Sequence, residues 1–132
     1  MLPALSVNQA ASPMPTPYRV PMAQFERELT GDVDRFVAHL DRAVPQGSIT
    51  TKYEDGSDST IGPARMVVRA YERFSAVGGN RVSLCISILS VGDRMALTAV
   101  TAGGSQAKFF KLNRFGEDAF LQQAVRAIEA FA

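Results

Sequence analysis

The sequence predicts an α+β fold, in which an antiparallel sheet of five to six strands carries two amphipathic helices on one face, in the order β-α-β-β-β-β-β-α. Two segments, 33–44 and 120–131, have apolar residues three and four positions apart, which is typical of a helix with one buried stripe. Most of the chain between them alternates apolar and polar residues, as half-buried strands do. Short turn sequences separate the last three of these strands from one another, and such turns favour antiparallel neighbours.

The first half of the chain supplies two strands and a helix. Residues 22–29 alternate and predict the first strand. The helix follows at 33–44, where Asp32 can accept hydrogen bonds from the free amides of the first turn. Residues 49–54 alternate again and predict the second strand, and the polar segment 55–63 predicts a loop.

The second half predicts a meander and a closing helix. Strands are expected at 64–74, 81–89 and 94–102, because each alternates and is bounded by glycine-containing turns. We expect a sixth strand at 105–112. The final helix should span 116–132, with its two acidic residues near the positive end of the helix dipole.

Composition limits the classes of protein. The length of 132 residues suits one domain. The chain has 14 Lys plus Arg and 13 Asp plus Glu, so it lacks the large positive net charge that would attract nucleic acid or anionic lipid. Nucleic acid is therefore disfavoured as a partner. Cys85 is the single cysteine, which excludes an internal disulfide and a multi-cysteine metal site. No apolar run reaches the roughly 18 residues of a membrane span. We expect a cytoplasmic protein with no membrane partner, no metal and no cofactor.

The proline distribution divides the chain into two regions. Five of the seven prolines fall within residues 1–21, where no apolar period develops. Such a segment buries too little surface to offset its ordering entropy, so we predict a disordered extension there. Residues 22–132 should form the single α+β domain, and Met22 is a candidate start of the natural protein.

Two glycine pairs suggest where a ligand would bind. In a meander the turns at 78–79 and 103–104 fall at the same end of the sheet, about 10 Å apart. Three interpretations stay open: a phosphate cradle, plain hairpin turns, which the sequence favours, or another recognition edge. Neither pair has P-loop spacing, and with a sixth strand after the second pair neither leads from a strand into a helix. The ligand-binding candidates at this end are Arg73, Asn80, Arg81, Ser105, Gln106 and Lys108.

The exposed face of the sheet is a second candidate surface. Alternation separates Met66, Val68 and Ala70 from the arginines and the tyrosine of the same strand. We expect these basic residues to flank an outward row of hydroxyls on the next strand, either as a solvated face, which we favour, or as a platform for single-stranded nucleic acid. The expected outward residues are Arg65, Arg69, Tyr71, Arg73, Arg81, Ser83, Cys85 and Ser87.

Catalytic chemistry finds little support in the sequence, and we assign no catalytic residue. His39 is the sole histidine and is interpreted as a satisfied or solvated helix residue, although the fold could bring it near Cys85. Cys85 lies in mid-strand and is interpreted as a small strand residue. The acidic residues Glu54, Asp55 and Asp58 lack the spacing of a calcium loop.

Two segments carry a family resemblance. "YERFSAVGGNRVSL" and "TAGGSQAKFFK" resemble two segments, GGNRVSL and GGSQAxFFK, of an uncharacterised bacterial family, one of the domains of unknown function. The resemblance extends from about Met22 to the final helix. It implies a small cytoplasmic bacterial protein and brings no activity, cofactor or catalytic residue.

Together these observations favour a small noncatalytic binding or protein-interaction domain. The alternative is a carrier that grips a small apolar or anionic ligand between the final helix and the sheet. An enzyme of unknown class is the third hypothesis. Because a sheet covered on one side leaves a face and two edges free, we expect a homodimer or a complex with another protein or small molecule.

Overall fold

A computed structural model describes residues 22–74, 81–103 and 110–131 of the chain. It has the predicted α+β fold, with an antiparallel sheet and two helices. In chain order the elements are β1 (Met22–Thr30), α2 (Val33–Gln46), β2 (Lys52–Ile61), β3 (Ala64–Phe74), β4 (Arg81–Val91), β5 (Arg94–Gly103) and α3 (Phe110–Glu129).

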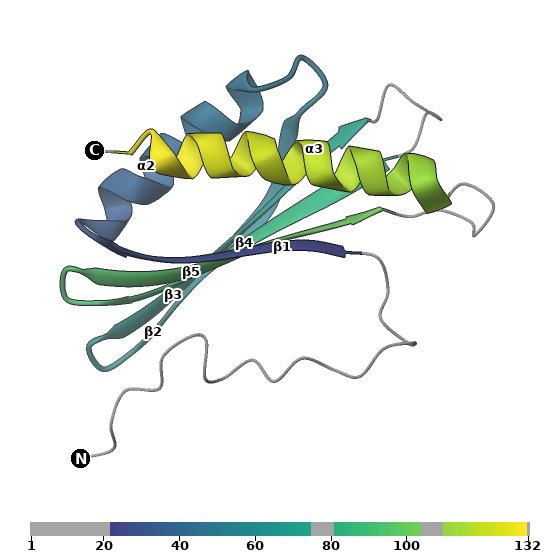
Figure 1. Cartoon of the computed structure of the whole chain (residues 1–132). Coiled ribbons are helices and arrows are strands. Elements are labelled where there is room, and N and C mark those ends of the chain that lie inside the picture. The colour runs from purple at the N-terminus through teal and green to yellow at the C-terminus, as the bar shows by residue number, and fades with distance from the viewer. Residues whose placement is uncertain (1–21, 75–80, 104–109, 132) are drawn as a thin grey trace, which may run out of the picture.

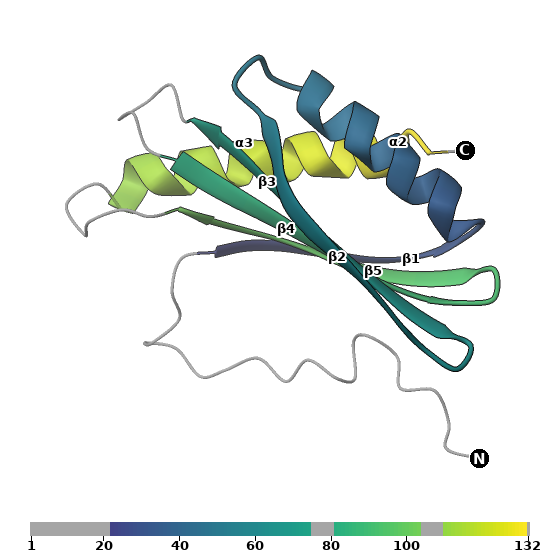
Figure 2. The same ribbon diagram turned by 180° about the vertical axis from the view of Figure 1, so that it is seen from behind.

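The five strands form one sheet in the order β1-β5-β4-β3-β2, and all neighbours are antiparallel. The central strand is therefore β4, and the edges are β1 and β2. Both helices lie on the same side of the sheet (Figure 1), and the view from behind shows the same two layers (Figure 2). Helix α3 packs over β1, β5 and β4, whereas α2 packs beside α3 and approaches β2.

Helix α2 forms where the sequence pattern predicts it. Asp32 accepts a hydrogen bond from the backbone N–H of Arg35 at 2.9 Å, which satisfies one free donor of the first turn. Gly47 closes the other end by donating its N–H to the Val44 carbonyl at 3.1 Å. The stripe of Val33, Phe36, Val37, Leu40 and Val44 is buried, as the spacing predicted.

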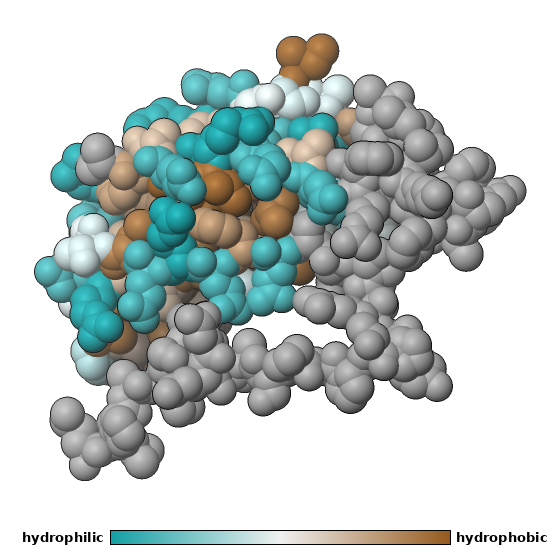
Figure 3. Space-filling model, viewed as in Figure 1, coloured by the Kyte–Doolittle hydropathy of each residue, from teal (hydrophilic) through white to brown (hydrophobic). Residues whose placement is uncertain are grey.

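The core lies between the two helices and the inner face of the sheet. Leu84, Ile86 and Ile88 of the central strand are fully buried, and they belong to one cluster with Phe120 and Ile128 of α3. Apolar side chains reach the surface in the band between α3 and β1, where polar residues flank them (Figure 3). Phe25 and Leu29 of β1 and Val125 of α3 are half-buried and pack against the core.

Two tight turns join the hairpins at one end of the sheet. Gly62 has φ 56° between β2 and β3, and Gly92 has φ 61° between β4 and β5. Residues other than glycine rarely adopt a backbone conformation with positive φ, which explains why each turn contains a glycine. The predicted turn at Val91, Gly92 and Asp93 is confirmed.

Three predicted elements differ from the structure by more than two residues. β2 spans Lys52–Ile61, so most of the segment predicted as a loop is strand. Its polar residues tolerate this because β2 is an edge strand with all ten residues exposed. The sixth strand predicted at 105–112 is wrong for its last residues, because α3 begins at Phe110, several residues earlier than expected. Residues 105–109 lie outside the described part of the chain.

Candidate functional site

Strand register determines which side chains point away from the helices. The buried residues Val67 and Tyr71 show that this alternate set of β3 faces the core. Arg69 pairs across the sheet with buried Ile86, so it also faces the helices. The prediction that Arg65, Arg69, Tyr71 and Arg73 lie on the exposed side is therefore wrong. Ser83 and Cys85 are exposed and Ser87 is half-buried on the opposite side, as predicted.

The outward side chains of the three central strands define a surface that we call the open face. Met66, Leu89 and Val91 are 49%, 45% and 46% exposed, and none of the outward residues between the two ends of these strands is charged. Glu72, Arg81 and Arg94 border the surface at its ends. The open face consists of Ala64, Met66, Val68, Ala70, Ser83, Cys85, Ser87, Leu89, Val91, Ala96, Thr98, Val100 and Ala102.

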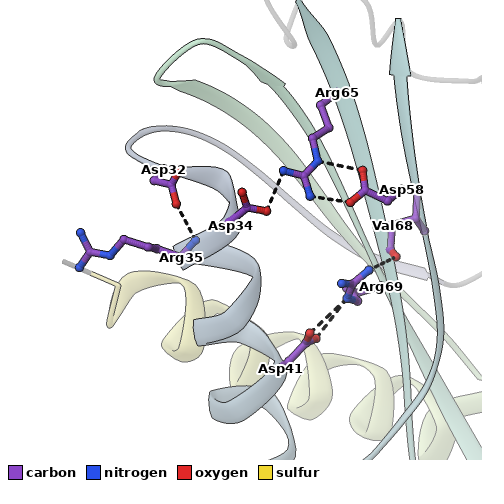
Figure 4. A network of polar contacts seen from close by, with 8 residues as sticks. All are labelled: Asp32, Asp34, Arg35, Asp41, Asp58, Arg65, Val68 and Arg69. Atoms are coloured by element: carbon purple, nitrogen blue, oxygen red, sulfur yellow. Dashed lines mark hydrogen bonds and ion pairs between the residues drawn. The ribbon is translucent and has the colours of Figure 1, made fainter.

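On the helix side, Arg65 joins the β2–β3 hairpin to α2 (Figure 4). Its Nε and Nη2 donate to the two carboxylate oxygens of Asp58 at 2.8 and 2.5 Å, and Nη1 donates to Asp34 at 2.7 Å. These hydrogen bonds hold the pKa of Asp58 below its ordinary value and raise the pKa of Arg65. Because Arg65 binds a carboxylate of the hairpin and one of the helix at the same time, this cluster acts as a tether between helix and hairpin.

A second polar cluster surrounds Asp41 in the middle of α2. Asp41 accepts hydrogen bonds from Arg69 Nε at 3.3 Å and from the Tyr71 hydroxyl at 2.7 Å. Burial, and then the hydrogen bond to Asp41, raise the pKa of Tyr71. Tyr53 packs edge-on against Tyr71 with ring centroids 5.9 Å apart. This cluster is also internally satisfied, and it fixes α2 to β3.

Arg73 lies at the other end of β3, under α3. Its Nη1 donates to Gln123 Oε1 at 2.6 Å, and its Cζ lies 5.5 Å from the centre of the Phe120 ring. Its Nε is buried and has no hydrogen-bond partner among the described residues. Burial, and then the charge of Arg126, lower the pKa of Arg73. Among the described residues this guanidinium has no carboxylate partner, unlike Arg65 and Arg69.

The structure separates the two described ligand-binding candidates. Arg73 pairs with buried Val82 and faces α3, whereas Arg81 pairs with exposed Phe74 on the opposite side of the sheet. Arg81 forms an ion pair with Glu72 and lies 5.9 Å from the centre of the Phe74 ring. Asn80, Ser105, Gln106 and Lys108 lie outside the described residues.

The topology places the strand ends that adjoin the two glycine pairs. β3 ends at Phe74 beside the start of β4 at Arg81, and Gly103 of β5 pairs with Val82, so these strand ends meet at one end of the sheet. After Gly103, however, the next described element is α3. The described elements on either side of the second glycine pair are therefore a strand and a helix, and what lies between them stays a prediction. Residues 104–109, which include the rest of the pair, lie outside the described part.

The remaining chemical candidates are separated or already paired. His39 Nε2 donates to the Ala127 carbonyl at 2.6 Å, which confirms a satisfied helix histidine. His39 lies on the helix side and exposed Cys85 on the open face, so the fold does not join them. Within 22–74, 81–103 and 110–131, no three His, Cys, Asp or Glu side chains gather as a metal ion would need.

Sequence reasoning missed Gln123. It is only 3% exposed, and its Nε2 donates to the Val44 carbonyl at 2.7 Å and to Thr51 Oγ1 at 3.1 Å. Its Oε1 accepts from Arg73, so one amide joins α2, α3 and β3. Its place one turn after Phe120, on the apolar stripe of α3, is the signal that could have identified a buried polar residue.

Fold and site together define a class: an α+β domain with an uncharged open sheet face and a partly buried arginine under its second helix. Residues 22–132 match the family described as Family of unknown function (DUF6054), and the chain belongs to that family. This confirms the predicted membership of a family without assigned function.

The other comparisons add little. The crystal structure of TTHA0849 from Thermus thermophilus is similar over 83% of this chain and 92% of that chain, with 10% sequence identity and a TM-score of 0.34. A likeness this weak carries no functional information. A search of the curated proteins found no match. None of the helices formed by the described residues is long and apolar enough to cross a membrane.

Proposed function

We propose that this protein is a noncatalytic interaction domain that pairs with a second copy of itself through the open face. The observation that carries the proposal is the lack of charge across the centre of the sheet face that neither helix covers (Figure 1). Leu89 and Met66, opposite each other on β4 and β3, expose nearly half of their side chains there. The centre of the face carries the hydroxyls of Ser87 and Thr98, and an uncharged face with exposed apolar side chains at one end is typical of an interaction site.

The size of the sheet suits a stable dimer. The open face has three strands spaced about 4.8 Å apart, with about ten residues each at about 3.3 Å per residue, which gives about 480 Å²; the outward sides of the two edge strands extend this face to about 800 Å². A standard protein interface buries about 800 Å² on each partner. Two such faces packed together therefore match the area of a specific complex, and twofold symmetry lets one surface serve as both partners.

Charge distribution favours the face over the edges. The edge strand β2 carries Lys52, Glu54, Asp55 and Asp58, and the other edge strand, β1, carries Glu26 and Glu28 on its outward side. Charges on edge strands oppose the addition of further strands. The open face has no such protection between its ends.

The interior supports an interaction domain more than a carrier. Side chains of α3 and of the central strands, such as Phe120, Ala124, Ile86 and Leu97, are buried together in one cluster between helix and sheet. The arginines Arg65 and Arg69 are paired with carboxylates there. These contacts have structural roles, which leaves the outer surface for recognition.

We further propose that the domain works in the cytoplasm, in a bacterial cell as the family resemblance implies. The exposed thiol of Cys85 lies near the middle of the open face. A free thiol at an interface between copies suits a reducing compartment, where it stays unoxidised.

The experiment compares Leu89→Asp with wild type by sedimentation velocity over a range of protein concentrations. The matched control is Ile49→Asp, because Ile49 is fully exposed and precedes β2, away from the open face. We expect wild type and the control to dimerise equally. Leu89→Asp should weaken dimerisation at least tenfold, since each copy would bury an unpaired carboxylate.

Circular dichroism checks that both variants are folded, which is expected because both side chains are exposed. A wild-type chain that stays monomeric would reject the proposal. Equal dimerisation of wild type and Leu89→Asp would show that copies pair through another surface.

A further inference from the structure

We propose that Arg73 and Arg126 form a binding site for a phosphate-type oxyanion, on the helix-covered side of the sheet. Arg73 projects from β3, and Arg126 lies on α3. The site is opposite the open face and does not depend on dimerisation. No sequence motif indicated it as a pair.

The unsatisfied guanidinium of Arg73 is the starting observation. A guanidinium has five N–H donors, and in Arg73 one of them binds the neutral amide of Gln123. The buried Nε has no acceptor in the described part of the chain, and the Phe120 ring lies 5.5 Å from Cζ. Placing a cation where water is partly excluded costs free energy unless an anion compensates it.

Among the described residues, the neighbouring charges do not supply that anion. Arg65 and Arg69, the other arginines of β3, bind Asp34, Asp58 or Asp41. Within the described residues Arg73 has no such partner, and the charge close enough to lower its pKa is another cation, Arg126. The pair therefore carries two positive charges with no described carboxylate between them.

Gln123 positions the donor group of Arg73. Its Nε2 donates to the Val44 carbonyl and to Thr51 Oγ1, which fixes the amide so that Oε1 faces Arg73. Arg126 follows Gln123 by three residues on the same helix, so the two side chains project from neighbouring positions. The exposed position of Arg126 lets an anion enter from solvent.

Charge matching selects the chemical class of the ligand. A phosphate group carries about 1.5 to 2 negative charges near neutral pH and offers several acceptor oxygens, which suits two guanidinium groups. Arginine forks bind such oxygens through paired hydrogen bonds. A carboxylate, with one charge, would neutralise half of the pair.

The test is a titration of the full-length protein with inorganic phosphate, in which the NMR signal of the Arg73 side-chain Nε–H is monitored. Chloride at equal ionic strength is the background control, and acetate is the singly charged comparison. We expect a saturable shift of the Arg73 signal with phosphate. Arg73→Gln, which removes the signal and so also assigns it, should abolish saturable changes elsewhere in the protein.

Two further variants separate binding from nonspecific charge effects. Arg126→Gln should weaken phosphate binding about tenfold, because it removes one charge-assisted contact. Arg42→Gln, which removes an exposed arginine of α2, should leave binding unchanged. Because Arg126 is exposed, its variant should fold even if Arg73→Gln does not.

The outcomes are distinct. A shift that grows linearly with salt of any kind would overturn the proposal, as would binding that survives both Arg73→Gln and Arg126→Gln. Equal affinity for acetate and phosphate would overturn the assignment to a doubly charged ligand. Methyl phosphate is titrated in parallel: tighter binding would point to a phosphate ester and equal binding to the free ion, and either result supports the site.

Discussion

Replacing Gly47 by alanine tests the packing that holds Gln123 against Arg73. A Cβ atom at position 47 would lie 2.4 Å from Cγ of Gln123 and 2.7 Å from both Cδ and Nε2. These distances are far shorter than a carbon contact allows. The Gln123 side chain would have to move, although it is buried and held by hydrogen bonds to Val44 and Thr51.

The expected magnitude follows from two opposing effects. Overpacking of this kind costs about 1–3 kcal/mol. Gly47 has φ −71° and ψ −14°, which alanine adopts without strain, so the substitution should also stabilise by about 0.4–1 kcal/mol through the unfolded chain. The clash is the larger effect, and we expect a net destabilisation of about 1–2 kcal/mol. For a domain near this size, each kcal/mol lowers Tm by about 4–8 °C.

A double-mutant cycle measured by urea denaturation isolates the clash. In a Gln123→Ala background the atoms that Cβ would strike are gone, so Gly47→Ala should be neutral or slightly stabilising. The sign of its effect should therefore reverse between the two backgrounds. An equal destabilisation in both backgrounds, or none in wild type, would refute the account of Gln123.

The remaining predictions concern the tethers and the core. Tyr71→Phe removes the hydroxyl that donates to Asp41 at 2.7 Å and should cost about 1.5 kcal/mol in urea denaturation; no loss would mean that Arg69 alone satisfies that carboxylate. The pKa of Asp58 is lowered by its hydrogen bonds from Arg65, so the stabilisation is present above the ordinary carboxyl pKa of about 4 and is lost as pH falls through the lower folded value. The difference in Tm between wild type and Asp58→Asn should shrink below about pH 4, and a difference independent of pH would contradict this. Ile86→Ala, in the middle of the core, should destabilise by about 2–5 kcal/mol, and a loss under about 1 kcal/mol would contradict its packing.

The fold class was predictable because each helix and most strands carry a clear period. The face of β3 was not, because both alternate sets of this strand contain apolar residues. Met66 and Val68 could face the core as well as Val67 and Tyr71 do. The carboxylates that bind the arginines on the helix side include Asp34 and Asp41, which lie on α2. No pattern within β3 reveals these partners.

The candidate sites were predictable only in part. Arg73 was chosen because it lies near a glycine turn, yet its partner Gln123 comes from a helix 50 positions away. Arg81 was grouped with it by sequence proximity, and alternation across the hairpin places the two on opposite sides of the sheet. Long-range pairing of this kind depends on how the helices cross the sheet, which local periodicity does not encode.

The most direct test of the pairing face uses Cys85, the single cysteine, which lies exposed on the central strand. Its rate of reaction with a small thiol reagent is measured at increasing protein concentration, alongside sedimentation velocity. If copies pair through the open face, the thiol should become protected over the same concentrations at which dimers form. Dimers with a fully reactive thiol, or protection that does not depend on concentration, would contradict the account.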